Sequence, residues 1–165
     1  MIYLEEIFYT QECQLVLKLL LIFILSGFIG LERASLSKPA GFRTHVLVGI
    51  SAVLVMDCGI YLYDKMEVDP TRIAAQLLSG IGFLGAGTIL RDGFSVKGLT
   101  TAASLLAVTC IGLIIGTGFY FGGIIATLIV YFVLTYSKII SEKVEHFNEL
   151  NLQIEVNNPK EVIEI

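Results

Sequence analysis

The chain has 165 residues and a net charge of −4; 55% of its residues are hydrophobic, only 16% are charged, and its mean hydropathy is +0.80. An average soluble protein carries about 25% charged residues, and a domain of this length cannot bury so much apolar surface, so the composition excludes an ordinary soluble domain and predicts a membrane protein. Lys and Arg lie in short loops rather than in a patch with interleaved aromatic residues, so no nucleic-acid partner is expected.

Five apolar windows follow one another along the chain. Each is close to the length of about 17–25 residues that a helix needs to cross a bilayer, and none alternates with the period of two that is typical of a membrane β-barrel. The predicted fold class is therefore an all-α membrane protein, a polytopic bundle of about five transmembrane helices. The windows are residues 15–31, 45–63, 73–90, 101–116 and 119–136.

Basic residues are distributed unequally among the loops that join these windows. Seven follow the first, third and fifth windows, whereas Lys65 and Arg72 lie between the second and third. The positive-inside rule therefore predicts an external N-terminus and a cytoplasmic C-terminus. Lys18, inside the outer part of the first window, is expected to extend its ammonium outward. The seven residues are Arg33, Lys38, Arg43, Arg91, Lys97, Lys138 and Lys143.

The character of the sequence changes after residue 137. The segment SEKVEHFNEL is predicted to continue the fifth helix into the cytoplasm, and residues 150–156 alternate as a half-buried strand does. Asn158 and Pro159 are typical of a helix start. We therefore expect a membrane domain over residues 1–137 and, over residues 138–165, the beginning of a truncated cytoplasmic domain.

The third window contains SGIGFLGAGTIL, which matches the G-x-G-x-x-G of a dinucleotide-binding turn. The preceding DPTRIAAQLLS is predicted to be a helix capped by Asp69 rather than a strand, and no acid lies about 20 residues further on, so the nucleotide interpretation is rejected. Two interpretations remain: a central helix packed through small residues, or a flexible or broken helix beside an ion-binding cavity. The small residues are Ala75, Ser79, Gly80, Gly82, Gly85, Ala86 and Gly87.

Asp57, in the second window, stands out because a charge inside a membrane span is costly and is a candidate functional group. One interpretation is that it binds a cation or carries a proton. The other is that it accepts hydrogen bonds from Arg72 or Gln76, near Asp69 at the outer end of the third helix. These four residues form the candidate polar or ion site.

A second charged group is expected near one plane on the cytoplasmic side. Because it contains both signs of charge, a structural ring of ion pairs and a site for an anionic partner or lipid head group both remain open. No nucleophile lies near a base at a suggestive spacing, so neither enzyme activity nor a cofactor is expected. The three cysteines are expected to be small buried hydrophobic residues. The charged group comprises Glu32, Arg33, Arg43, His45, Arg91, Asp92 and Lys97.

Several motifs together resemble those of the MgtC/SapB family of bacterial membrane proteins. The resemblance covers about residues 24 to 122, with the motifs in the same order, and the glycine-rich run is the most recognisable of them. The motifs are GLER at 30–33, KPAGFRTH at 38–45, DPTRIAAQ at 69–76, GIGFLGAGTILR at 80–91 and VKGLTTAA at 96–103.

This resemblance implies a bacterial inner-membrane protein with, in most members, a soluble ACT-like C-terminal domain. It also implies a regulatory role in magnesium homeostasis, acid resistance and virulence, exerted on other membrane proteins such as a P-type Mg²⁺ ATPase or the F-type ATP synthase. The small-residue surface favours a homo-oligomer, with a dimer preferred. The alternative function is transport of Mg²⁺, another cation or a small solute through a site around the glycine-rich third helix.

Overall fold

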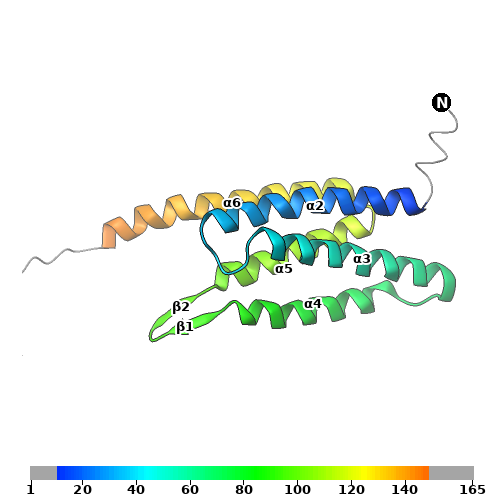
Figure 1. Ribbon diagram of the computed structural model, residues 1–165, viewed down its shortest axis with the longest axis horizontal. Helices are drawn as coiled ribbons and strands as arrows, with labels where there is room; N and C mark the ends of the chain where they lie inside the picture. Colours follow the sequence, from blue (N-terminus) through cyan, green and yellow to red (C-terminus); the bar gives the residue numbers. More distant parts are fainter. Residues whose placement is uncertain (1–10, 149–165) are drawn as a thin grey trace, which may run out of the picture. The chain divides into compact units, whose positions relative to one another are not determined.

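The computed structural model describes residues 11–148, and the chain divides into two compact units, Met1–Val133 and Leu134–Ile165. Within the described residues, five α-helices follow one another and one β-hairpin joins two of them (Figure 1). The elements are α2 (Gln11–Ser35), α3 (Phe42–Met66), α4 (Pro70–Gly87), β1 (Leu90–Asp92), β2 (Ser95–Lys97), α5 (Leu99–Gly116) and α6 (Tyr120–Asn148).

Three of these helices, α2, α3 and α5, are long and apolar enough to cross a membrane. With 25, 25 and 18 residues they extend over about 27–38 Å at 1.5 Å per residue, against a hydrocarbon thickness of about 30 Å. The same criterion of length and composition does not select α4, and the apolar part of α6, Tyr120–Tyr136, is shorter. The protein is an all-α membrane protein, as its composition predicts.

The helix at the centre of the first unit is α3, which packs against α2, α4 and α5 (Figure 1). This differs from the interpretation that the glycine-rich helix is central. Of the α4 residues, Ile81 and Gly85 are buried, and the polar Arg72 and Gln76 are exposed on the same helix. α4 therefore lies at the side of the unit, along α3 and α5.

The close approach of α3 to its neighbours depends on glycines at the contact points. A Cβ atom added at Gly49 would lie 2.9 Å from Cγ1 of Ile22 on α2. One added at Gly112 of α5 would lie 2.6 Å from the Cβ of Ala52 and 2.7 Å from the carbonyl oxygen of Gly49. Real Cβ contacts are essentially never shorter than 3.0 Å, so these helices reach this separation only because both positions lack a side chain.

The start of α4 is as predicted, with Asp69 as the cap and Pro70 at the first position. The Asp69 carboxylate accepts hydrogen bonds from the hydroxyl of Thr71 at 2.7 Å and from its backbone N–H at 2.9 Å. These two bonds hold the pKa of Asp69 below its usual value. The helix ends at Gly87, three residues before the predicted window does, because the chain then enters β1.

The β-hairpin between α4 and α5 is absent from the sequence prediction. Asp92 of β1 pairs with Ser95 of β2, which leaves Gly93 and Phe94 as a two-residue turn. The φ angle of Gly93 is 59°, and a glycine with positive φ at the first turn position fits a type II′ hairpin. A glycine at the first of the two turn positions is the sequence signal for such a turn.

The other element predictions can be compared with the structure directly. Each of the five windows coincides with one helix, and the predicted continuation of the fifth helix is confirmed, since α6 ends at Asn148. The expectation of buried cysteines is wrong for Cys58 and Cys110, which are exposed on α3 and α5. The predicted strand at 150–156 and the helix start at Asn158 lie outside the described residues.

Replacing Gly112 by alanine should lower the free energy of unfolding by about 1–3 kcal/mol, because the new methyl group meets the backbone of α3. The matched control is Gly80→Ala on α4, where an added Cβ meets nothing within 4 Å; alanine there should be neutral or stabilising by up to about 1 kcal/mol. Thermal unfolding in detergent, followed by circular dichroism, measures both. Equal unfolding temperatures for the two variants would contradict this packing.

Candidate functional site

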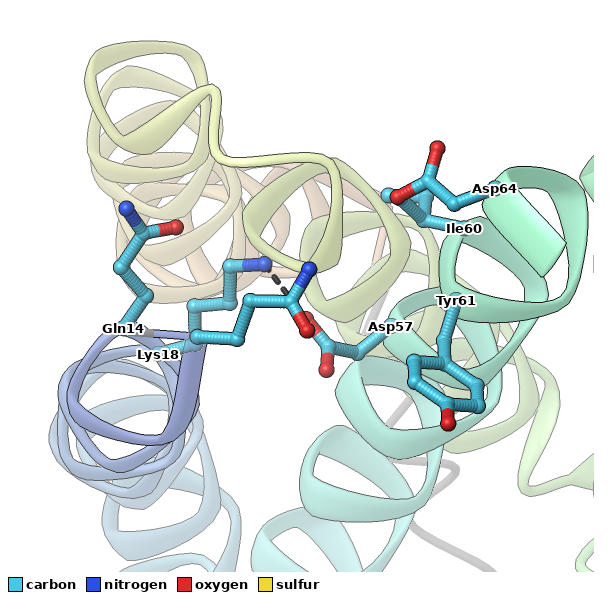
Figure 2. A pocket seen from close by; sticks show the side chains of 7 residues that line it. Gln14, Lys18, Asp57, Ile60, Tyr61 and Asp64 are labelled. Atoms are coloured by element: carbon cyan, nitrogen blue, oxygen red, sulfur yellow. Dashed lines mark hydrogen bonds and ion pairs between the residues drawn. The ribbon is translucent and has the colours of Figure 1, made fainter. Parts of the chain in front are cut away.

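An ion pair inside the membrane spans joins Lys18 of α2 to Asp57 of α3. The Lys18 Nζ atom lies 2.5 Å from Asp57 Oδ1, and the two side chains are 9% and 28% exposed. Figure 2 shows Lys18 extending from α2 across the helix interface toward Asp57. Lys18 therefore does not extend outward to the membrane surface as expected; it neutralises the acid on the neighbouring span, which lowers the cost of both charges.

The ion pair lines a small polar cavity between α2 and α3 (Figure 2). Its volume is about 100 Å³, which is enough for several water molecules. Residues with carboxylate, amide and phenol groups are among those that line it, and the oxygens of such groups are ligands that hard cations prefer. The lining residues are Gln11, Gln14, Lys18, Asp57, Ile60, Tyr61 and Asp64.

Asp57 faces away from the residues of α4 that the sequence analysis grouped with it. Gly59, two positions later on α3, packs on the start of α4: a Cβ added there would lie 3.1 Å from the Cβ of Pro70. Two helical residues correspond to a rotation of about 200°, so Asp57 points toward α2 instead. Among the described residues its hydrogen-bond partner is Lys18, while Arg72 and Gln76 remain exposed on α4.

The small residues of α4 divide into a covered part and an uncovered part. Gly85 is buried against α5, where an added Cβ would lie 3.4 Å from the Cβ of Ala102. Cβ atoms added at Gly80, Gly82 or Gly87 would meet nothing within 4 Å. α4 is a continuous helix, not a broken one. We define the open face of α4 by the exposed small residues that recur along one side of the helix, Ala75, Ser79, Gly82 and Ala86.

An apolar groove lies between α4 and α5 beside this open face. Gly82, Gly85 and Ala86 line it from α4, and Ala102 and Ala103 line it from α5. A groove walled by glycine, alanine and other apolar residues offers no side-chain ligand to an ion. It offers a surface on which another helix can approach closely. Among the described residues, a polar cavity instead lies between α2 and α3.

The charged group predicted for the cytoplasmic side separates into buried and exposed members. Arg33 is 3% exposed, and its Nε and Nη2 atoms donate to the carboxylate of Glu32 at 2.8 and 3.2 Å. Arg33 Nη1 is also buried and has no hydrogen-bond partner among the described residues, which leaves its two N–H groups for water or an anionic acceptor. Arg43, Arg91 and Lys97 are exposed.

His45 is fully buried and connects the beginning of α3 to the beginning of α5. Its Nδ1 donates to the carbonyl oxygen of Gly41 at 2.9 Å, and its Nε2 lies 3.0 Å from Ser104 Oγ. Ser104 Oγ also lies 2.8 Å from the carbonyl oxygen of Thr101, so its single hydroxyl hydrogen can serve either acceptor. The imidazole thus holds two helix starts together rather than joining a ring of surface ion pairs.

Sequence reasoning identified Lys18, Asp57 and His45, but it missed which residue each of them contacts. The five apolar windows contain one Lys or Arg residue, Lys18, and one Asp or Glu residue, Asp57. Charge neutralisation inside a membrane is therefore the signal that predicts their contact. For Ser104 no comparable signal exists, because it is one of several hydroxyl residues in an apolar helix and lies 59 residues from His45.

The helices and the internal ion pair define an integral membrane protein of the all-α class. The model of the MgtC family matches residues 19–143 of the chain. The chain belongs to the MgtC family, as its motifs indicate.

The chain is similar to several curated relatives over part of their length. YhiD of Escherichia coli (strain K12), which is named provisionally as a magnesium transporter, is 41% identical over 130 residues, 75% of this chain and 60% of the relative. The protein MgtC of Brucella abortus (strain 2308) is 42% identical over 109 residues, 66% of this chain and 44% of the relative. The protein MgtC of Salmonella typhimurium (strain LT2) is 37% identical over 143 residues, which is 85% of this chain and 58% of the relative. The chain thus spans about half the length of these relatives, and no solved structure matches it.

Removing one partner of the ion pair should cost more than removing both. Asp57→Leu leaves the Lys18 ammonium buried without a counter-charge and should lower the free energy of unfolding by about 3 kcal/mol. The double variant Lys18→Met/Asp57→Leu buries no charge and should regain most of that loss. Denaturant unfolding in detergent measures both. If the single and double variants are equally destabilised, the ion pair does not hold α2 to α3.

Proposed function

We propose that this protein is a regulatory or accessory membrane protein of the MgtC type that acts through helix contacts made by the open face of α4. The observation that carries the proposal is a contrast between glycines. Gly49 and Gly112 are in tight contact inside the chain, whereas Gly82 faces open space. Because close approach of backbones drives helix association in lipid, a bare surface on α4 supports a partner helix from another molecule.

The partner we favour is a second copy of this chain, in a dimer. Phe83 is 81% exposed and lies next to Gly82, so a bulky side chain and a bare surface stand side by side on one helix. In a twofold dimer the same patch faces itself, and Phe83 of each copy can enter the groove beside α4 of the other. A P-type Mg²⁺ ATPase or the F-type ATP synthase, implied by the family resemblance, are the further partners that we propose.

The setting that we propose is the bacterial inner membrane, with several spans, an external N-terminus and a cytoplasmic C-terminus. The distribution of seven basic residues against two among the loops supports this orientation. The process that we propose is adaptation to low magnesium, acid or intracellular stress. Its support is membership of the MgtC family and the magnesium-related name of one relative.

Cysteine crosslinking in native membranes tests the contact. In a background in which Cys13, Cys58 and Cys110 are replaced by serine, Gly82→Cys should give an oxidised dimer. The matched control is the neighbouring Ile81→Cys, which should not crosslink because that position is 5% exposed and faces the inside of the unit. In the cysteine-containing chain, Gly82→Leu should weaken association about tenfold, which corresponds to about 1.4 kcal/mol.

Two results would contradict this proposal. Recovery of Gly82→Cys as monomer only would remove the second copy as partner. Unchanged growth of the Gly82→Leu strain at low magnesium would show that the open face of α4 does not serve the function. A crosslink to a different membrane protein, with loss of growth in Gly82→Leu, would keep the contact role and replace the second copy by that protein.

A second candidate function, passage of Mg²⁺, another cation or a small solute, is favoured by one observation, the polar cavity beside Asp57. Its carboxylate oxygens lie between two helices that are each long enough to cross a membrane. A cation that reached Asp57 would have to displace Lys18, whose ammonium occupies that carboxylate. The site of this candidate is therefore between α2 and α3 rather than around the glycines of α4.

Flux measurements on proteoliposomes separate this candidate from the contact role. If the cavity conducts, Asp57→Asn should reduce flux of Mg²⁺, protons or monovalent cations by about tenfold or more, because it removes the charge at the centre of the cavity. Asp69→Asn is the control, since Asp69 caps α4 away from the cavity. Flux no higher than in empty vesicles, or equal flux in both variants, rules out passage through this cavity.

A further inference from the structure

The β-hairpin between α4 and α5 presents a fully exposed aromatic side chain at its tip. Phe94 follows Gly93 in the two-residue turn and is completely exposed, at 105% of its reference area. Leu90 and Val96 on the two strands are 63% and 46% exposed. Figure 1 shows the hairpin extending beyond the ends of α4 and α5. Such apolar exposure is costly in water and calls for an environment that covers it.

The position of the hairpin along the chain puts it at the membrane boundary. Lys97, the last residue of β2, is two residues before the start of α5, which is one of the three helices able to cross a membrane. A three-residue strand is about 10 Å long, and the headgroup region extends several ångströms beyond the hydrocarbon on each side. The tip of the hairpin therefore lies within reach of the lipid headgroups.

Basic residues lie on both strands of the hairpin and at the same end of the unit. Arg91 on β1 and Lys97 on β2 are both exposed. Arg43 is exposed in the first turn of α3, and the hydrogen bond between His45 and Ser104 places that turn at the same end of the unit as the start of α5. Exposed cations beside apolar residues are the combination that binds an anionic lipid surface.

We propose that the hairpin inserts Phe94 among the lipid headgroups of an anionic leaflet, with Arg91 and Lys97 binding lipid phosphates. The occupant is lipid rather than another protein, because the hairpin directly adjoins a membrane span and its exposed charges complement anionic headgroups. The interaction anchors the connection between α4 and α5, and it is independent of whether the open face of α4 binds a second copy.

The chain contains no tryptophan, so Phe94→Trp places a unique fluorophore at the tip. The full chain is reconstituted into vesicles of phosphatidylcholine, with or without phosphatidylglycerol, in which the acyl chains are brominated either near the headgroup or near the methyl end. We expect bromines near the headgroup to quench the fluorophore more strongly. We also expect quenching to increase with the phosphatidylglycerol content and to decrease with salt.

Two variants make the test specific. Arg91→Gln and Lys97→Gln, made in the Phe94→Trp chain, should each raise the phosphatidylglycerol content needed for half-maximal quenching by about fivefold. The control is Phe119→Trp, at a 60% exposed position in the turn between α5 and α6. Residues 99–137 carry no charge, so quenching at that position should not depend on phosphatidylglycerol or on salt.

Three outcomes would overturn the proposal. Water-like emission from Phe94→Trp in both lipid mixtures would show that the tip stays in solvent. Blue-shifted emission without bromine quenching would show that protein, not lipid, covers it. If quenching does not change with phosphatidylglycerol content, with salt or with either glutamine substitution, the basic residues bind no anionic headgroup.

Discussion

The close approach of α3 to α2 and α5 is the constraint on which the first unit of this protein depends. No hydrophobic force drives helices together in lipid, so their association relies on close packing and on polar contacts between them. Gly49 and Gly112 allow that packing because they put no side chain between the helices. At this short separation Lys18 reaches Asp57 at one end of α3 and His45 reaches Ser104 at the other.

The same packing separates two kinds of surface that the sequence places close together. Polar groups collect between α2 and α3, where the paired Lys18 and Asp57 line a small cavity. Small apolar residues collect on α4 and α5, where Gly82 remains uncovered. A cation and a partner helix would therefore use different parts of the protein. This separation makes the two candidate functions independent of each other.

Much of the fold is predictable from local patterns, and most of the candidate site is not. Apolar length identifies all five helices, and the Asp69-Pro70 pair identifies the start of α4, because both signals lie within a few residues of the chain. The hairpin was missed although Gly93 marks its turn, because its strands have only three residues each. The contact between His45 and Ser104 joins helices distant in sequence, and no local pattern encodes it.

The sequence by itself determined that this is an all-α membrane protein of the MgtC family, because hydrophobic length and motif order are properties of the linear chain. The tertiary structure decided which helix is central and which neighbour each polar group faces. Asp57 and Gly59 differ by about 200° around α3, so one turns to α2 and the other to α4. Which neighbouring helix a residue faces depends on how the packed helices are rotated relative to one another. In this packing Gly82 is uncovered, whereas Gly112 is enclosed.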